Sequence, residues 1–418
     1  MYHQYFRSGK NYRGKKSKSK LIIAVILIII AAAVTTGILW ANGFFSSKES
    51  VETINPGDTL LSPADSTEEN DGGNQEDLPL REAVKVKGLY VTGWSAGIPD
   101  RIEHFIELCG QTEINALVID VKDDSGELSF KSEIAQNSAA AVNKIRNPEE
   151  IVAKLKSHGI YTIARIVCFK DPIWSRENPG LAIKDKNGNL WKDAKGFTWL
   201  NPYISESWDY LINVAREAAR LGFDEVQFDY IRFPTDGNIK EIDYGDADWK
   251  ITKTEAVGEF LKYARQELQN ENIFVSADVF GIIAVSRLDS ETIGQDLEIM
   301  ARNADSLCPM IYPSHYANKG QNGVGQYIND ILFEAPDKQP YEVIYNTLLL
   351  IKDRVSDIED GAVIRPYLQD FTLGSGSIYY QEYTAQQIRE QIQAVYDAGF
   401  EEWIFWNSSN IYTEDAFR

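Results

Sequence analysis

The sequence predicts an α/β protein in which a (β/α)8 TIM barrel follows a transmembrane helix and a disordered acidic stalk. Strand-like and helix-like segments alternate from residue 86 onward. Eight strand-like segments fit into the roughly 330 remaining residues, as expected for a barrel with insertions. An open doubly wound sheet is the alternative, but the sequence lacks the glycine-rich first turn that marks the ligand site of that fold.

The N-terminal segment is basic and then apolar. Residues 1–20 carry seven lysines and arginines and no acid, and residues 21–40 contain no charge. A helix needs roughly 20 apolar residues to cross a bilayer. We therefore expect a basic cytoplasmic tail over residues 1–20, a transmembrane signal anchor over 21–43, and a single-pass protein of the cell membrane with an extracellular catalytic domain. A cleaved signal peptide is the alternative, but its apolar region usually has only about 7–15 residues.

Residues 44–85 are predicted to form a flexible acidic linker. From residue 46 to 85 there is no aromatic residue, and Glu, Asp, Ser, Asn, Gly and Pro dominate, so this segment cannot bury enough apolar surface to fold. Removing the seven N-terminal positive charges from the formal net charge of −20 leaves −27 for residues 48–418. So acidic a domain argues against nucleic acid as a partner, because nucleic acid is bound by neutralising phosphates.

The TIM barrel is predicted to span residues 86–418. Its strands are expected at residues 86–92, 114–122, 160–169, 223–234, 273–278, 306–312, 362–369 and 402–406. Its helices are expected at residues 100–111, 148–158, 205–221, 253–269, 290–303, 324–333 and 384–398. Gly159, Gly222 and Gly399 each follow a predicted helix, where a C-terminal cap belongs. The Asn-Gly pair in residues 185–189 predicts a hairpin in the loop after the third strand.

Polar and aromatic residues gather at the carboxyl ends of the predicted strands, where a TIM barrel keeps its active site. Aromatic rings beside charged groups suit a sugar, whose C–H face stacks on a ring while its hydroxyls form hydrogen bonds. The residues expected to bind substrate are Trp94, Asp120, Lys122, Arg165, Gln227, Tyr230, Arg232, Tyr312, His315, Tyr367, Gln369 and Trp406. A buried ion pair between Asp120 and Lys122 is the alternative for those two residues.

Asp229 and Asp278 are the candidate catalytic residues. Strand alternation places Gln227 and Asp229 on one face, and Asp278 ends the next strand along the chain. Cleavage of a glycosidic bond commonly needs one carboxylic acid that protonates the leaving oxygen and one carboxylate that acts as nucleophile or base. We expect Asp229 to be the nucleophile or base and Asp278 the acid. A helix cap or an ion pair with Arg232 is the structural alternative for Asp229.

No metal and no cofactor are expected. The acidic cluster at residues 123–127 lacks the ligand spacing of an EF-hand loop, so a turn explains it better. His315 is the only histidine at a predicted strand end, and a zinc site would need further ligands.

Four motifs resemble a bacterial family of "putative glycoside hydrolase" domains, formerly a domain of unknown function. They are ALVIDVKDDSG (116–126), FDEVQFDYIRFP (223–234), VSADVFG (275–281) and CPMIYPSHY (308–316). The resemblance implies a TIM barrel distantly similar to α-amylase-like barrels, with the nucleophile at Asp229. Those barrels usually carry an arginine where this chain has Gln227 and a glutamate where it has Asp278, so Asp305 or Asp370 could be the acid instead.

Together these features predict a membrane-anchored extracellular glycoside hydrolase that acts on a polysaccharide, either a cell-wall glycan or an exopolysaccharide. A non-catalytic glycan-binding barrel at the cell surface is the main alternative. A polysaccharide deacetylase-like enzyme is a third hypothesis, and it would require a metal.

Overall fold

A computed structural model describes residues 84–245, 250–374 and 376–418. The predicted cytoplasmic tail (1–20), the predicted anchor (21–43) and all but the last two residues of the predicted linker (44–85) lie outside these ranges. Within them, no helix has both the length and the apolar character needed to cross a bilayer.

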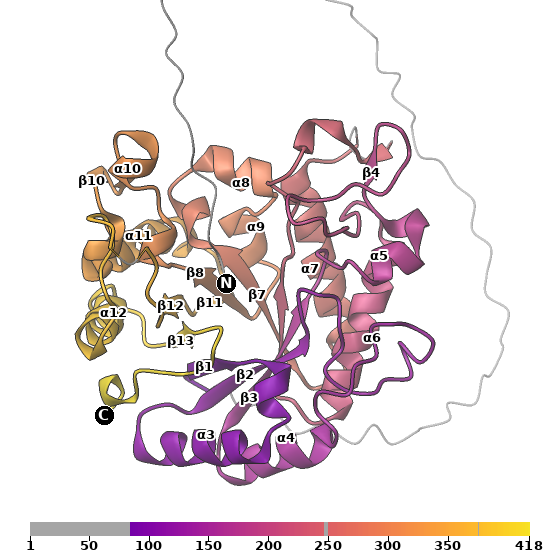
Figure 1. The fold of residues 1–418 in the computed structure, drawn as a ribbon, viewed down its shortest axis with the longest axis horizontal. Coiled ribbons are helices and arrows are strands. Elements are labelled where there is room, and N and C mark those ends of the chain that lie inside the picture. The colour runs from indigo at the N-terminus through magenta and orange to yellow at the C-terminus, as the bar shows by residue number, and fades with distance from the viewer. Residues whose placement is uncertain (1–83, 246–249, 375) are drawn as a thin grey trace, which may run out of the picture. The chain divides into compact units, whose positions relative to one another are not determined.

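Eight parallel strand positions close into a barrel (Figure 1). The strands are β1 (Lys87–Val91), β2 (Ala116–Lys122), β3 (Tyr161–Val167), β5 (Glu225–Asp229), β7 (Phe274–Phe280), β8 (Ser306–Met310), β11 (Val363–Ile364) with β12 (Tyr367–Gln369), and β13 (Trp403–Trp406). Strands β11 and β12 share the seventh position, because Pro366 between them has no N–H to donate to a neighbour. Strand β13 pairs with β1 and closes the barrel, which confirms the predicted (β/α)8 barrel.

Helices lie outside the barrel (Figure 1). The longer ones are α3 (Pro99–Gln111), α4 (Pro148–Ser157), α6 (Glu206–Arg220), α7 (Lys253–Leu268), α11 (Pro340–Val355) and α12 (Ala385–Asp397). Shorter elements are α2 (Gly93–Ala96), α5 (Trp174–Glu177), α8 (Arg287–Ile293), α9 (Leu297–Ala301), α10 (Lys319–Asn322), and the strand pairs β4 (Lys184–Asp185) with β6 (Ile242–Asp243) and β9 (Gln326–Ile328) with β10 (Ile331–Phe333). The hairpin turn predicted at residues 185–189 is confirmed by the hydrogen bond from Asp185 N to Asn189 O.

Two helix predictions are wrong in part or in full. The segment 290–303 is divided between α8 and α9, because Gly294 takes a left-handed conformation (φ 83°) that ends α8 and Asp296 then caps α9. The segment 324–333 is a hairpin, in which Asn329 and Asp330 both have positive φ (51° and 62°), as a two-residue turn between twisted strands requires. The helix of this region is α11, which starts at Pro340, a residue that favours the first turn of a helix.

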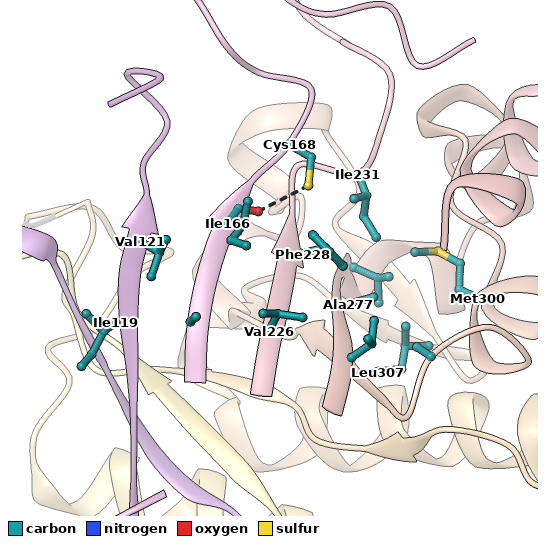
Figure 2. Close-up of a cluster of buried hydrophobic side chains, with 14 of the residues drawn as sticks. Ile119, Val121, Ile166, Cys168, Val226, Phe228, Ile231, Ala277, Met300 and Leu307 are labelled. Carbon is teal, nitrogen blue, oxygen red and sulfur yellow. Dashed lines mark hydrogen bonds between the residues drawn. The ribbon is translucent and has the colours of Figure 1, made fainter. Parts of the chain in front are cut away.

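The strands divide their side chains between two environments. Figure 2 shows Val226 and Phe228 of β5 in the apolar layer beside Ala277 of β7 and Met300 of α9, and all four are buried. Because strand side chains alternate, Glu225, Gln227 and Asp229 belong to the opposite face, which is the interior of the barrel. That interior is therefore partly polar at three successive levels.

The lowest level of the interior is a buried ion network. Arg365 Nη1 lies 2.8 Å from Glu225 Oε1, and Arg365 Nε lies 2.7 Å from Glu402 Oε2. The Tyr161 hydroxyl donates to the second oxygen of Glu225 at 3.1 Å. At the level above, Gln227 accepts from the Tyr367 hydroxyl at 2.6 Å and donates to Cys308 Sγ at 3.3 Å. Glu225, Gln227 and Arg365 therefore all have partners inside the barrel.

Replacing Arg365 should destabilise the fold strongly. Arg365→Met leaves Glu225 and Glu402 buried without a cation, which should lower the free energy of unfolding by about 3–5 kcal/mol. Urea unfolding of the full chain, purified in a mild detergent, measures the change. The control is Lys262→Met, which removes an exposed ion pair with Glu259 and should change the value by less than about 1 kcal/mol. Equal effects of the two substitutions would contradict a structural role for the network.

Candidate active site

A cavity of about 740 Å³ opens at the carboxyl ends of the barrel strands, and this volume suits a small-molecule or sugar site. Both predicted catalytic residues and most of the predicted binding residues line it. The predicted residues in the cavity wall are Asp120, Arg165, Asp229, Tyr230, Arg232, Asp278, Tyr312, His315, Tyr367 and Trp406. The barrel therefore brings together residues that lie almost 300 positions apart in the chain.

Arg165 of β3 is the centre of this site. Its Nη1 lies 2.5 Å from Asp120 Oδ1, and its Nε lies 3.1 Å from Asp229 Oδ2 and 3.9 Å from Asp278 Oδ2. The guanidinium also lies over the rings of Tyr90 and Trp406, which stack on each other with their centres 3.7 Å apart. A single cation therefore serves three buried carboxyl groups.

The register of the barrel explains how Asp229 obtains its arginine. Gln227 occupies the position where α-amylase-like barrels usually carry an arginine. Arg165 is the direct register partner of Gln227 on the neighbouring strand β3. The guanidinium thus reaches Asp229 from the adjacent strand, and Arg232, the partner that the sequence suggested, forms no ion pair with Asp229.

Asp229 and Asp278 are close enough to act on one glycosidic bond. Because the same nitrogen lies 3.1 Å from Asp229 Oδ2 and 3.9 Å from Asp278 Oδ2, these oxygens are at most about 7 Å apart. This upper limit lies below the roughly 9.5 Å at which the most widely separated carboxyl pairs still cleave glycosides.

The two aspartates differ in their surroundings. Asp229 accepts hydrogen bonds at both oxygens, from Arg165 and from Tyr230 N at 2.6 Å. Burial, followed by the negative charge of Asp229, raises the pKa of Asp278 well above its usual range. Within the described residues, Asp278 Oδ1 is buried and has no hydrogen-bond partner. A carboxyl group that keeps its proton at neutral pH is what a general acid requires.

Tyr230 has an unusual backbone conformation. Its φ of 53° is left-handed, which costs a non-glycine residue of order 1–3 kcal/mol and is most often found at functional sites. The turn comes directly after Asp229 and puts the Tyr230 side chain into the cavity wall. Lys170 Nζ and Arg232 Cζ each lie 4.9 Å from the centre of its ring.

His315 is held in one tautomer by a chain of hydrogen bonds. The amide of Gln369 is oriented by main-chain groups, because its oxygen accepts from Ser314 N at 3.2 Å and its nitrogen donates to Phe371 O at 2.8 Å. The Ser314 hydroxyl must then donate to that oxygen, at 2.8 Å, and can only accept from His315 Nδ1, at 3.1 Å. Burial lowers the pKa of His315, so the ring is neutral with its proton on Nδ1. Nε2 is left as an acceptor.

Four predicted binding residues lie outside the cavity wall. Lys122 is fully buried, because the strand register shifts after Asp120; its Nζ lies 2.9 Å from Asp171 Oδ2 and donates to Val167 O at 2.6 Å. The suggested ion pair between Asp120 and Lys122 is therefore absent: Lys122 pairs with Asp171, and Asp120 pairs with Arg165. Trp94 lies in α2, 61% exposed, with Lys144 Nζ 5.7 Å from its ring.

The other two outliers, Gln227 and Gln369, support the wall from behind. Gln227 is fully buried at the middle level of the barrel interior, bonded to Tyr367 and Cys308. Gln369 is fully buried beneath His315. Both side chains are occupied by protein partners, so they position cavity residues and do not face a substrate.

The alternative acids, Asp305 and Asp370, do not line the cavity. Asp305 precedes β8 at the amino end of the barrel, where it accepts from Val275 N at 2.8 Å and pairs with Arg265 at 3.0 Å. Asp370 accepts from Thr413 N and Thr413 Oγ1, both at 2.8 Å, and thereby fixes the C-terminal segment. Asp278 is therefore the best placed of the three candidate acids.

Several cavity residues were not predicted from the sequence. Tyr90 donates to Asp120 Oδ2 at 2.5 Å, and alternation along the first predicted strand could have indicated it. Asp124 pairs with Lys170 at 2.7 Å. Gln326 comes from the hairpin that was predicted as a helix. Across the described ranges, no three His, Cys, Asp or Glu side chains gather as metal ligands would.

Comparisons with known proteins agree with the barrel fold. The sequence model of a family described as "Putative glycosyl hydrolase domain" matches residues 88–412. A hypothetical protein from Ruminiclostridium thermocellum is 41% identical over 46% of this chain and 97% of its own, with a TM-score of 0.43. The PgaB (BpsB) glycoside hydrolase domain from Bordetella bronchiseptica is 12% identical over 79% of this chain and 97% of its own, and its TM-score of 0.57 indicates a shared fold. Among curated proteins, no match was found.

The raised pKa of Asp278 predicts a pH-dependent gain in stability for Asp278→Asn. Between about pH 4 and the raised folded-state pKa, the native state holds a proton that the unfolded state has lost, so wild-type stability falls as pH rises. The asparagine variant lacks this proton and its effect on stability. Its free energy of unfolding should therefore rise relative to that of wild type by up to about 1.4 kcal/mol per pH unit. Urea unfolding of the full chain from pH 4 to 8 measures it. Exposed Asp353→Asn is the control, and a difference that stays constant with pH would refute the assignment.

The hydrogen-bond chain predicts the tautomer of His315. In full-length protein with 15N-labelled histidine, the ring of His315 should show a protonated Nδ1 and an unprotonated Nε2 at pH 7. His315→Gln identifies the signal by its loss, and Ser314→Ala should shift the ring toward the Nε2–H form. A wild-type ring with its proton on Nε2 would rule out the proposed chain.

Proposed function

Because the chain belongs to the family described as a glycosyl hydrolase domain, we propose that it is a membrane-anchored extracellular enzyme that cleaves a cell-wall glycan or an exopolysaccharide. The family resemblance of its four motifs is thereby confirmed. One observation carries the proposed mechanism: Asp229 and Asp278 share Arg165 within about 7 Å of each other, yet only Asp229 has both oxygens hydrogen-bonded.

In the proposed mechanism, Asp278 donates its proton to the oxygen of the leaving sugar. Asp229 either attacks the anomeric carbon or removes a proton from the attacking water. Arg165 places its positive charge closer to Asp229 than to Asp278, and burial with the charge of Asp229 raises the pKa of Asp278, so the two carboxyl groups differ as the reaction needs. The limit of about 7 Å is compatible with retention at ~5–5.5 Å and with the short end of the inverting range.

The aromatic wall supports a sugar substrate. Trp406 stacks on Tyr90, and Tyr312 lies edge-on to Phe371 with ring centres 5.6 Å apart. Such rings offer apolar faces to sugar C–H groups, while Asp120 and Nε2 of His315 can accept hydrogen bonds from hydroxyls. The basic tail, apolar segment and acidic linker of residues 1–85 support placement of this site outside the cell membrane.

A non-catalytic glycan-binding barrel is the second candidate. It would have aromatic platforms without two carboxyl groups within ~10 Å of each other in the cleft. The closeness of Asp229 to Asp278 favours hydrolysis over binding alone.

The proposal predicts new reducing ends when the full chain is incubated with purified cell-wall glycans and exopolysaccharides. Asp229→Asn should lower the rate of release at least about 100-fold, because it removes the nucleophile or base. Asp353→Asn, an exposed change on α11, should release sugar at the wild-type rate. Equal rates for Asp229→Asn and wild type would disprove the assignment, and glycan binding without release would favour the non-catalytic barrel.

A further inference from the structure

Arg232 lines the cavity without an ionic partner in the described part of the chain. It follows β5 and is half-buried. Its guanidinium carbon lies 5.0 Å from the ring centre of Trp199 and 4.9 Å from those of Tyr230 and Phe280. Nη1 donates to Phe233 O at 3.1 Å, and the Tyr230 hydroxyl is a second acceptor. No described carboxylate lies within 4.0 Å of the guanidinium.

The other cations near the barrel interior all have carboxylate partners. Lys122 pairs with Asp171, Lys144 with Glu127, Arg165 with Asp120 and Asp229, Lys170 with Asp124, and Arg365 with Glu225 and Glu402. The chain has 62 acidic and 42 basic residues, so acids are plentiful. A half-buried cation without a carboxylate in contact is costly, and burial lowers the pKa of Arg232 despite the charges of Tyr230, Asp229 and Asp236 nearby. The cavity therefore offers a place for a negative group.

We infer that Arg232 binds a carboxylate of the substrate, so that the glycan carries an acidic sugar, such as a uronic acid or a sugar with a lactyl ether. This inference rests on the proposed function and specifies its substrate class. A guanidinium recognises a carboxylate through two parallel N–H donors, and the three rings around Arg232 hold it in place before the ligand arrives.

The position of Arg232 also locates the acidic sugar. Arg232 is three residues from Asp229. It lies on the loop after β5, and the left-handed turn at Tyr230 directs this loop along the cavity wall. A sugar whose carboxylate meets Arg232 therefore lies at, or beside, the bond that faces Asp229. The chain as a whole is strongly acidic, so a single carboxylate at this one cation fits better than a densely phosphorylated polymer.

The test compares sugars that differ only in a carboxylate-bearing group. Glucuronate is paired with glucose, and N-acetylmuramate with N-acetylglucosamine. Binding to the full chain is measured by ligand-observed NMR titration. Wild type should bind at least one acidic sugar about 10-fold or more tightly than its neutral partner, since a hydrogen bond to a charged group is worth that much. Arg232→Gln should bring the ratio close to one, and Arg232→Lys should keep an intermediate preference.

Arg302→Gln, an exposed arginine change, is the matched control and should keep the wild-type ratio. Urea unfolding checks that each variant is folded. Equal binding of both members in each pair, or a preference that survives Arg232→Gln, would overturn the inference. Release of reducing ends is measured separately: release without acidic preference leaves the hydrolase proposal standing, and acidic preference without release leaves the carboxylate site standing.

Discussion

The interaction on which this site depends is the sharing of Arg165 by three buried carboxyl groups. One positive charge cannot balance three negative charges in a medium from which water is excluded, so at least one carboxyl group has to keep a proton. Asp120 and Asp229 take the short contacts with Arg165, and Asp278 has the long one at 3.9 Å. Burial raises the pKa of Asp120 as well, but the pKa of Asp278 is raised well above its usual range, so the shortage of positive charge falls mainly on Asp278. The difference between the proposed acid and the proposed base therefore depends on how one arginine is placed.

That placement depends on the levels of the barrel interior below it. Strand β5 supplies Glu225, Gln227 and Asp229 at three successive levels. Each side chain has its own hydrogen-bond partner at its level, which is Arg365, Tyr367 and Arg165 respectively. Gln227 is neutral and fully occupied by Tyr367 and Cys308, which separates the ion network of Arg365 from that of Arg165. An arginine at position 227 would add a second cation beneath Asp278. The neutral amide of Gln227 therefore adds no positive charge near Asp278, which favours the protonated form of that carboxyl group.

Features that depend on hydrophobic periodicity and on the positions of strand ends could be predicted from the sequence. The eight strands, five of the helices, and Asp229 and Asp278 in the cavity all follow from alternation and chain order. The pairing of charges could not be predicted, because it depends on register. Lys122 faces Asp171 since the register shifts after Asp120, and Arg165 serves Asp229 since it lies beside Gln227. The hairpin at 326–333 was missed because the apolar spacing around Asn329 and Asp330 also fits a helix.

The left-handed turn at Tyr230 connects these electrostatics to the shape of the cavity. A tyrosine with φ 53° persists only where its surroundings fix it, and here three contacts do so. Asp229 Oδ1 accepts from the Tyr230 N–H at 2.6 Å, while Lys170 and Arg232 lie against its ring. The carboxyl group that makes the first contact is held at its other oxygen by Arg165. The contact between Asp229 and Arg165 thus also supports the turn that brings Tyr230 and Arg232 into the wall, so the proposed catalytic carboxyl group and the proposed substrate-binding surface depend on each other.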